Sequence, residues 1–165
     1  ELRKLIDDLE DDVKISLSDN KIHFSFGNVE LTSKLIDGTF PDYQRVIPKG
    51  NDKMMTVPAR AFQDAVDRVA TISSEKSRAV KLEAKSGMAV VTANSPELGT
   101  ASDELEVVYD GPEIQIGFNA RYLLDITALI GGADMTFEMM DSVSPTLVKN
   151  ADDEASLFVL MPMRV

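Results

Sequence analysis

The sequence predicts an α+β fold in which one arrangement of elements is repeated three times. Apolar residues recur at helical spacing in three separate segments. Each of these segments is followed by three short strand-like runs that are bounded by turn residues. A further strand precedes the second and the third helix, so the repeated unit is a strand, a helix and three strands. The order of elements, more than sequence identity between the repeats, supports this prediction.

The first repeat occupies the sequence up to residue 36. A helix is predicted over 1–10, where the leucines and the isoleucine have helical spacing. Strands are predicted over 13–18, 21–26 and 29–36. Along 21–26 apolar and polar residues alternate, which is typical of a strand with one buried and one wet face.

The second repeat follows after a turn-rich segment. It begins with a predicted strand over 53–57 and a helix over 58–73, with Pro58 in the first turn. Four apolar residues form one stripe of this helix, namely Phe62, Val66, Val69 and Ile72. The remaining strands of this repeat are predicted over 78–84, 88–94 and 101–109.

The third repeat has the same order. A strand over 113–118 leads into a helix over 119–130, which Asn119 is expected to cap. Its remaining strands are predicted over 135–139, 144–149 and 156–161. The second and third repeats together therefore predict one complete domain of two similar halves.

Turn residues are densest at 37–43 and 48–52, which predicts a domain junction between about residues 40 and 52. Residues 1–44 would then be a partial domain and residues 45–165 a complete one. The first repeat starts inside its helix and with Glu1, so we expect a longer protein upstream.

The final segment, LFVLMPMRV (157–165), is unusually apolar for the end of a sequence. Residues 157–160 are predicted to form the last core strand. Pro162 has no N–H and is expected to end strand pairing. The residues that follow it would then be free to line a cleft.

Composition excludes several classes of protein. Lys and Arg total 17 against 28 Asp and Glu, a formal net charge of −11, which argues against gripping nucleic-acid phosphates over the whole surface. Cysteine is absent, so disulfides, thiolate metal sites and a thiol nucleophile are excluded. With no apolar run near the roughly 20 residues of a membrane helix, we expect a cytoplasmic protein without a membrane partner.

Catalytic and metal-binding patterns are missing from the sequence. His23 is the sole histidine, and no acidic residue or serine lies at a spacing from it that would indicate a catalytic pair. The acidic runs at 7–12 and 152–154 do not match a calcium loop. The Gly-Gly pair at 131–132 follows a helix and is expected to end it, whereas a phosphate loop opens a helix. We therefore expect no enzyme activity, no metal and no cofactor.

Basic residues on the two later helices allow two interpretations. Arg60 and Arg68 lie with aspartates on the wet stripe of one helix, and Arg121 lies with Asp125 on the other. These stripes are either solvated faces of mixed charge or faces that lie opposite a phosphate backbone without binding it tightly.

Four segments together resemble the bacterial sliding clamp, the beta subunit of the replicative DNA polymerase. They are TSKLIDGTFPDYQRVIPK (32–49), GFNARYLLD (117–125), DSVSP (141–145) and VLMPMRV (159–165). The resemblance covers the whole chain, in matching order and spacing. It implies the DNA-clamp fold, with helices on one face of antiparallel sheets, and a ring-shaped homodimer that encircles double-stranded DNA. Residues 1–44 would be the second half of the middle domain and 45–165 the C-terminal domain.

The resemblance also implies a groove that receives short peptides containing glutamine and hydrophobic residues. The partners implied are the DNA polymerase III alpha subunit, the clamp loader and repair polymerases. Flexible, polarizable methionines suit a groove with several partners. The positions that match the family's groove are Pro41, Arg45, Val46, Ser77, Asn119, Tyr122, Val143, Pro145, Val159, Leu160, Met161, Pro162, Met163, Arg164 and Val165.

Further roles follow from the same resemblance. Arg60, Arg68 and Arg121 would face the DNA. A ring holds DNA by enclosing it, so it needs few phosphate contacts and net acidity is compatible with the role. The contact with the next subunit would be made by Thr71, Ile72, Glu97, Asp103 and Glu104.

Two other functions stay open from the residues alone. A generic β-rich domain could bind proteins through exposed edge strands, and its peptide binding would not depend on the final segment. A hydrolase could use His23 or the acidic runs, and a His23→Ala variant with intact activity would exclude it.

Overall fold

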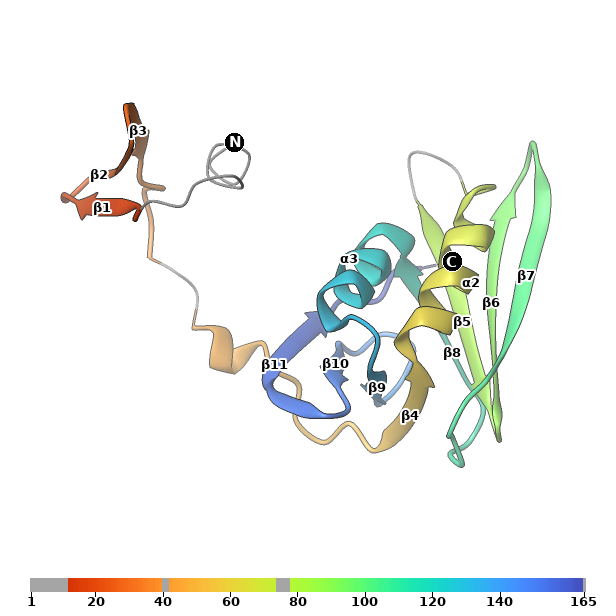
Figure 1. The fold of residues 1–165 in the computed structure, drawn as a ribbon. Helices are drawn as coiled ribbons and strands as arrows, with labels where there is room; N and C mark the ends of the chain where they lie inside the picture. Colours follow the sequence, from red (N-terminus) through yellow and green to blue (C-terminus); the bar gives the residue numbers. More distant parts are fainter. Residues whose placement is uncertain (1–11, 40–41, 74–77, 165) are drawn as a thin grey trace. The chain divides into compact units, whose positions relative to one another are not determined.

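The computed structural model describes residues 12–39, 42–73 and 78–164. The chain divides into two compact units, Glu1–Pro41 (unit 1) and Asp42–Val165 (unit 2), and each is described by itself (Figure 1). The helix predicted over 1–10 lies outside the described residues. The domain boundary placed after residue 44 stays a prediction.

Unit 1 contains a three-stranded antiparallel sheet in the order β1-β2-β3. Its strands are β1 (Lys14–Leu17), β2 (Lys21–Phe26) and β3 (Val29–Lys34). The three predicted strands are therefore confirmed, with slightly shorter ends. Phe26 is buried, whereas Ile15 and Leu17 are exposed. The alternation along β2 thus buries little within unit 1.

Unit 2 contains the two complete repeats, predicted above as the second and the third of the chain; from here on they are called the first and the second repeat of unit 2. The first repeat is β4 (Lys53–Pro58), α2 (Ala59–Ala70), β5 (Ala79–Lys85), β6 (Met88–Ser95) and β7 (Gly99–Glu106). The second repeat is β8 (Ile114–Asn119), α3 (Ala120–Ile130), β9 (Asp134–Met139), β10 (Thr146–Asn150) and β11 (Asp153–Leu160). Every element predicted for these repeats is present. A short 3-10 helix that was not predicted, η1 (Tyr43–Arg45), precedes them.

The first helix differs from its prediction at both ends. Pro58 is the last residue of β4 and precedes the helix without a capping side-chain hydrogen bond. The helix ends at Ala70, three residues early. The N–H groups of Ile72 and Ser73 bond carbonyl groups three residues back, which tightens the chain into a final turn.

The second helix matches its prediction. The side chain of Asn119 accepts a hydrogen bond from the Arg121 N–H at 2.9 Å, which confirms the cap. Gly131 ends the helix with a φ of 77°, a conformation that L side chains rarely adopt. The Gly-Gly pair therefore terminates a helix, as expected.

Each four-stranded sheet combines strands from both repeats. One sheet has the order β11-β10-β9-β4 and the other β7-β6-β5-β8, with antiparallel pairing throughout. The first strand of each repeat thus joins the three last strands of the other repeat. This exchange ties the two repeats into one unit.

The two repeats are also joined by backbone pairing of the residues that follow the last strand of each repeat. Thr56 on β4 and Val108 exchange two backbone hydrogen bonds of 2.9 Å. Gly117 on β8 pairs with Met163, whose N–H donates to the Gly117 carbonyl at 2.8 Å. Thr56 and Gly117 each lie three residues before a helix, so the bridges are equivalent. The strand predicted over 101–109 is split, because Val108 pairs with the other sheet.

Buried side chains from both helices and both sheets form one core. The ring of Phe62 on α2 packs against that of Phe137 on β9 at a centroid distance of 5.1 Å. Within the predicted stripe of α2, Phe62, Val66 and Val69 are buried, and Ile72 is half-buried beyond the helix end. The helices pack against each other (Figure 1). The α+β class with antiparallel sheets is therefore confirmed.

Candidate peptide-binding groove

The final segment runs from one sheet to the other. Val159 and Leu160 belong to β11 and pair with β10. Beyond Pro162, the N–H of Met163 bonds the carbonyl of Gly117 on β8. The expectation that Pro162 frees the following residues from pairing was therefore wrong for Met163. Proline cannot donate, but the residue that follows it pairs with a strand of the other sheet.

An apolar hollow of about 530 Å³, called the helix hollow, lies between α3 and β11. Its lining is mainly apolar, and Tyr122 is 57% and Met161 62% exposed. Such a surface provides apolar area to a partner together with the adaptable shape of methionine. It is lined by Tyr122, Asp125, Ile126, Leu129, Leu157, Phe158, Val159, Leu160 and Met161.

A second hollow of about 780 Å³, the junction hollow, borders the helix hollow because Met161 lines both. Arg45 at its rim forms an ion pair with Asp42 at 3.3 Å. The hollow is lined by Asp42, Gln44, Arg45, Val46, Ile47, Pro48, Lys49, Asn51, Met140, Ser144, Pro145 and Met161.

Asn51 fixes one wall of the junction hollow, a role that the sequence reasoning missed. Its side-chain amide donates to the carbonyl of Glu138 at 2.8 Å and to that of Pro145 at 3.0 Å. These bonds hold the loop at Pro145 against β9. An asparagine in a turn-rich segment carries no local signal for partners so distant in sequence.

A third hollow of about 560 Å³, the tail hollow, lies beside Met163 and Arg164. Its remaining lining residues are Lys81, Gln115, Gly117, Ser142, Val143 and Pro162. Met161 and Pro162 are consecutive and line the helix and tail hollows respectively, so the final segment connects the hollows. We call the junction, helix and tail hollows together the groove.

Asp141 orders the loop that carries Val143. Its Oδ1 accepts hydrogen bonds from the N–H groups of Val143 (2.9 Å) and Ser144 (2.6 Å), and its Oδ2 accepts one from Ser144 Oγ (3.0 Å). The backbone hydrogen bonds from Val143 and Ser144 lower the pKa of the Asp141 carboxyl below its usual value. The ionised carboxylate therefore shapes the loop between the tail and junction hollows.

The structure distributes the predicted groove residues as follows. The junction hollow contains Arg45, Val46, Pro145 and Met161; the helix hollow Tyr122, Val159, Leu160 and Met161; the tail hollow Val143, Pro162, Met163 and Arg164. Asn119 lines none of these three and instead caps α3, which carries Tyr122. Pro41, Ser77 and Val165 lie outside the described residues.

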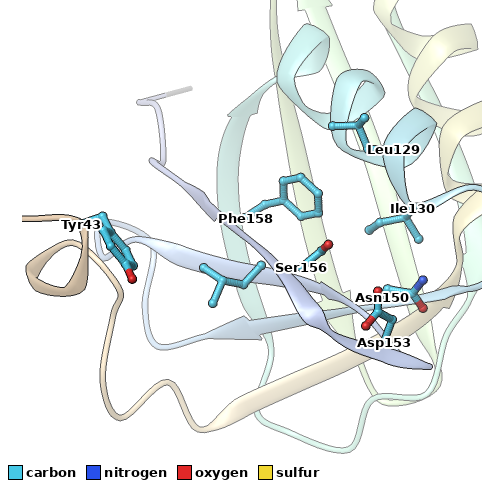
Figure 2. A pocket seen from close by; sticks show the side chains of 8 residues that line it. Tyr43, Leu129, Ile130, Asn150, Asp153, Ser156 and Phe158 are labelled. Carbon is cyan, nitrogen blue, oxygen red and sulfur yellow. The ribbon is translucent and has the colours of Figure 1, made fainter. Parts of the chain in front are cut away.

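A further hollow of about 690 Å³, the strand hollow, was not expected from the sequence. It adjoins the helix hollow, because Leu129, Leu157 and Phe158 line both. Figure 2 shows the side chains of α3 and β11 that border it. The expectation that 157–160 form a plain core strand was wrong for Leu157, which is 43% exposed. The reason is that β11 is an edge strand, with one of its flanks unpaired within its sheet.

The three arginines predicted to face DNA each lie beside a carboxylate. All three have exposed side chains. The ion pairs are Arg60–Asp64 at 3.2 Å, Arg121–Asp125 at 4.0 Å and Arg68–Asp103 at 2.7 Å. The last pair brings together a residue predicted to face DNA and one predicted to face a second subunit.

The other predicted subunit contacts lie at the end of α2 and along β7. The hydroxyl of Thr71 donates to the carbonyl of Arg68 at 2.7 Å, and Ile72 packs at the border of the core. Glu97 and Glu104 are exposed, Glu97 between β6 and β7 and Glu104 on β7 itself. β7 is an edge strand of its sheet, so one flank is unpaired within that sheet.

The described part of the chain contains no group of His, Cys, Asp and Glu residues able to hold a metal ion. His23 Nδ1 lies 2.8 Å from Oγ1 of Thr32, its partner on the neighbouring strand β3. No helix among the described residues is long and apolar enough to cross a membrane. The groove of unit 2 exposes apolar area at Tyr122 and Met161, the kind of surface that peptide-binding grooves present.

The chain matches known proteins over its whole length. Residues 44–164 match the C-terminal domain of the DNA polymerase III beta subunit, and residues 1–42 match its central domain. The beta sliding clamps of Caulobacter vibrioides and Escherichia coli K12 are 49% and 36% identical over 165 residues, which are 44% and 45% of those proteins. The chain thus spans less than half of their length.

Solved structures agree with the sequence matches. A sliding clamp from Bartonella birtlesii, bound to griselimycin, is 48% identical with a TM-score of 0.89, and the match covers 99% of this chain and 44% of that one. A clamp from Caulobacter crescentus gives a TM-score of 0.88 at 48% identity, with the same coverage. The chain belongs to the family of DNA polymerase III beta subunits, the beta sliding clamps.

Proposed function

We propose that the chain is the peptide-binding part of a DNA replication processivity factor. The observation that carries the proposal is the groove, whose three hollows are connected by the final segment from Val159 to Arg164. Family membership supports the assignment. The factor itself carries out no reaction and acts in the cytoplasm, where the chromosome is copied.

In this proposal the groove receives short peptides that contain glutamine and hydrophobic residues. The helix hollow takes the hydrophobic side chains against Tyr122 and Met161, where apolar area is exposed. Polar groups at the rim, such as Arg164, orient the peptide. The DNA polymerase III alpha subunit, the clamp loader and repair polymerases would compete for this one groove.

The complete protein would encircle double-stranded DNA as a homodimeric ring. Residues 1–44 would be the second half of the middle domain and 45–165 the C-terminal domain, whose β7 edge and α2 end would contact the next subunit. Enclosure explains how a chain with a net charge of −11 stays on DNA with few phosphate contacts. We expect the 165-residue chain alone to form no stable dimer that retains circular DNA, a result that light scattering would check.

Titration with a fluorescent clamp-binding peptide tests the groove. We expect saturable binding that Met163→Ala and Arg164→Ala each weaken. Met54→Ala is the matched control, because Met54 is exposed on β4 and lines none of the hollows described above. Absence of binding at high micromolar concentration would contradict the proposal. Binding that both tail variants leave unchanged would instead favour a generic interaction domain.

A further inference from the structure

Both repeats of unit 2 carry the same ion pair at the same helix position. Arg60 is the second residue of α2 and pairs with Asp64 at 3.2 Å. Arg121 is the second residue of α3 and pairs with Asp125 at 4.0 Å. Most other exposed positions of the two helices differ, so this repeated pair calls for a physical explanation.

Helix stability does not provide that explanation. The positive end of the helix dipole favours acidic residues in the first turn, yet the first turn of each helix has an arginine and no acid. An acid four residues before a base stabilises a helix better than the reverse order, and the order here is the reverse. Neither Arg60 nor Arg121 is therefore placed where it best stabilises its helix.

The two helices carry no net charge. The two helices contain three arginines and three aspartates, and each arginine lies within 4.0 Å of a carboxylate once Asp103 on β7 is included. The rest of the chain is strongly acidic. The faces proposed to look toward DNA thus attract phosphates through arginines whose charge is already partly compensated.

We propose that Asp64 and Asp125 restrain the DNA contacts of Arg60 and Arg121. The inference rests on the proposed function, in which a ring encloses the duplex, and on the expectation from the family resemblance that Arg60 and Arg121 face that duplex. Each carboxylate competes with DNA phosphate for the guanidinium group, so a phosphate contact requires the exposed pair to separate. The arginines then make short-lived contacts, which lets an enclosing ring slide.

The test measures binding of the 165-residue chain to a short fluorescein-labelled DNA duplex over a range of salt concentrations. We expect an Asp64→Asn/Asp125→Asn double variant to bind about tenfold more tightly at low salt, with a salt slope steeper by about 0.9 for each additional phosphate that the variant neutralises. The control is Asp110→Asn/Glu113→Gln, which raises the net charge equally in the loop before β8 and should change affinity less than about twofold.

A second set of variants identifies the groups that bind phosphate. Adding Arg60→Gln and Arg121→Gln to the Asn double variant should abolish the increase in affinity. An equal increase in the loop control, or an increase that survives loss of the arginines, would overturn the inference. These outcomes are distinct from failure of the proposed function, which would appear as absence of peptide binding by the unmodified chain.

Discussion

The two repeats of unit 2 share a framework and differ on its surface. Phe62 in α2 and Leu123 in α3 occupy equivalent positions, and both are buried. Arg68 of the first repeat corresponds to Leu129 of the second, each being the tenth residue of its helix. Asp103 likewise corresponds to Leu157, each being the fifth residue of the last strand of its repeat.

In the proposed function, this difference decides which repeat receives an apolar partner. In the first repeat the two positions form an ion pair of 2.7 Å that closes the helix against the strand. In the second repeat they are leucines, 74% and 43% exposed, which line the helix and strand hollows. Buried positions thus maintain the fold in both repeats, while two exposed positions make the surface charged in the first repeat and apolar in the second.

The shared core gives the largest expected effect. Phe62→Ala should lower the free energy of unfolding by about 3–5 kcal/mol and Leu123→Ala by about 2–5 kcal/mol, because each leaves a cavity in one common core. Urea unfolding followed by circular dichroism measures both. Leu129→Ala is the control and should change stability by less than about 0.5 kcal/mol. A loss below about 1 kcal/mol for Phe62→Ala would show that the repeats do not depend on one core.

The equivalent bridges should respond differently to proline. Val108→Pro removes the N–H of a two-bond bridge inside the chain and should cost about 1–3 kcal/mol of unfolding free energy. Met163→Pro removes the N–H bonded to Gly117 and should mainly weaken peptide binding. The alanine variants at Val108 and Met163 retain the N–H and separate side-chain from backbone effects. Unchanged stability in Val108→Pro would contradict the stabilising role assigned to the Thr56–Val108 bridge.

Exchanging the surface residues sharpens the comparison. A Leu129→Arg/Leu157→Asp variant gives the second repeat the ion pair of the first and should weaken peptide binding about tenfold, or 1.4 kcal/mol. Its stability should stay within about 1 kcal/mol, because exposed ion pairs contribute little. Isothermal titration calorimetry measures the affinity. Full peptide affinity in the exchanged variant would separate these leucines from the groove.

The smallest effect concerns the loop at Asp141, whose carboxyl has a lowered pKa. Its hydrogen bonds to Val143 and Ser144 stabilise the loop above the carboxyl's unfolded-state pKa and are lost as pH falls through the folded-state pKa. An NMR pH titration should show the Val143 and Ser144 amide signals moving together with this carboxyl, below the usual range for aspartate. Amide signals that do not follow the carboxyl would contradict this account.

The sequence was sufficient to predict every element of unit 2 except η1, because turn residues and apolar periodicity are local signals. It could not show that β4 and β8 exchange sheets, since strand partners depend on contacts between distant segments. The same limit applies to Asn51, whose bonds reach Glu138 and Pro145. Apolar character identified Leu157 as a strand residue, but its exposure follows from the position of β11 at a sheet edge.

The most direct test of the central claim maps a clamp-binding peptide onto both repeats of one molecule. A titration of the isotope-labelled chain, followed by its amide and methyl NMR signals, should give saturable shifts at Tyr122, Met161 and Met163. The positions of the first repeat that are equivalent to Tyr122 and Met163, namely Ala61 and Val108, should remain unshifted. Equal shifts in both repeats, or none at the second up to millimolar peptide, would contradict the claim that the peptide binds at the second repeat and not at the first.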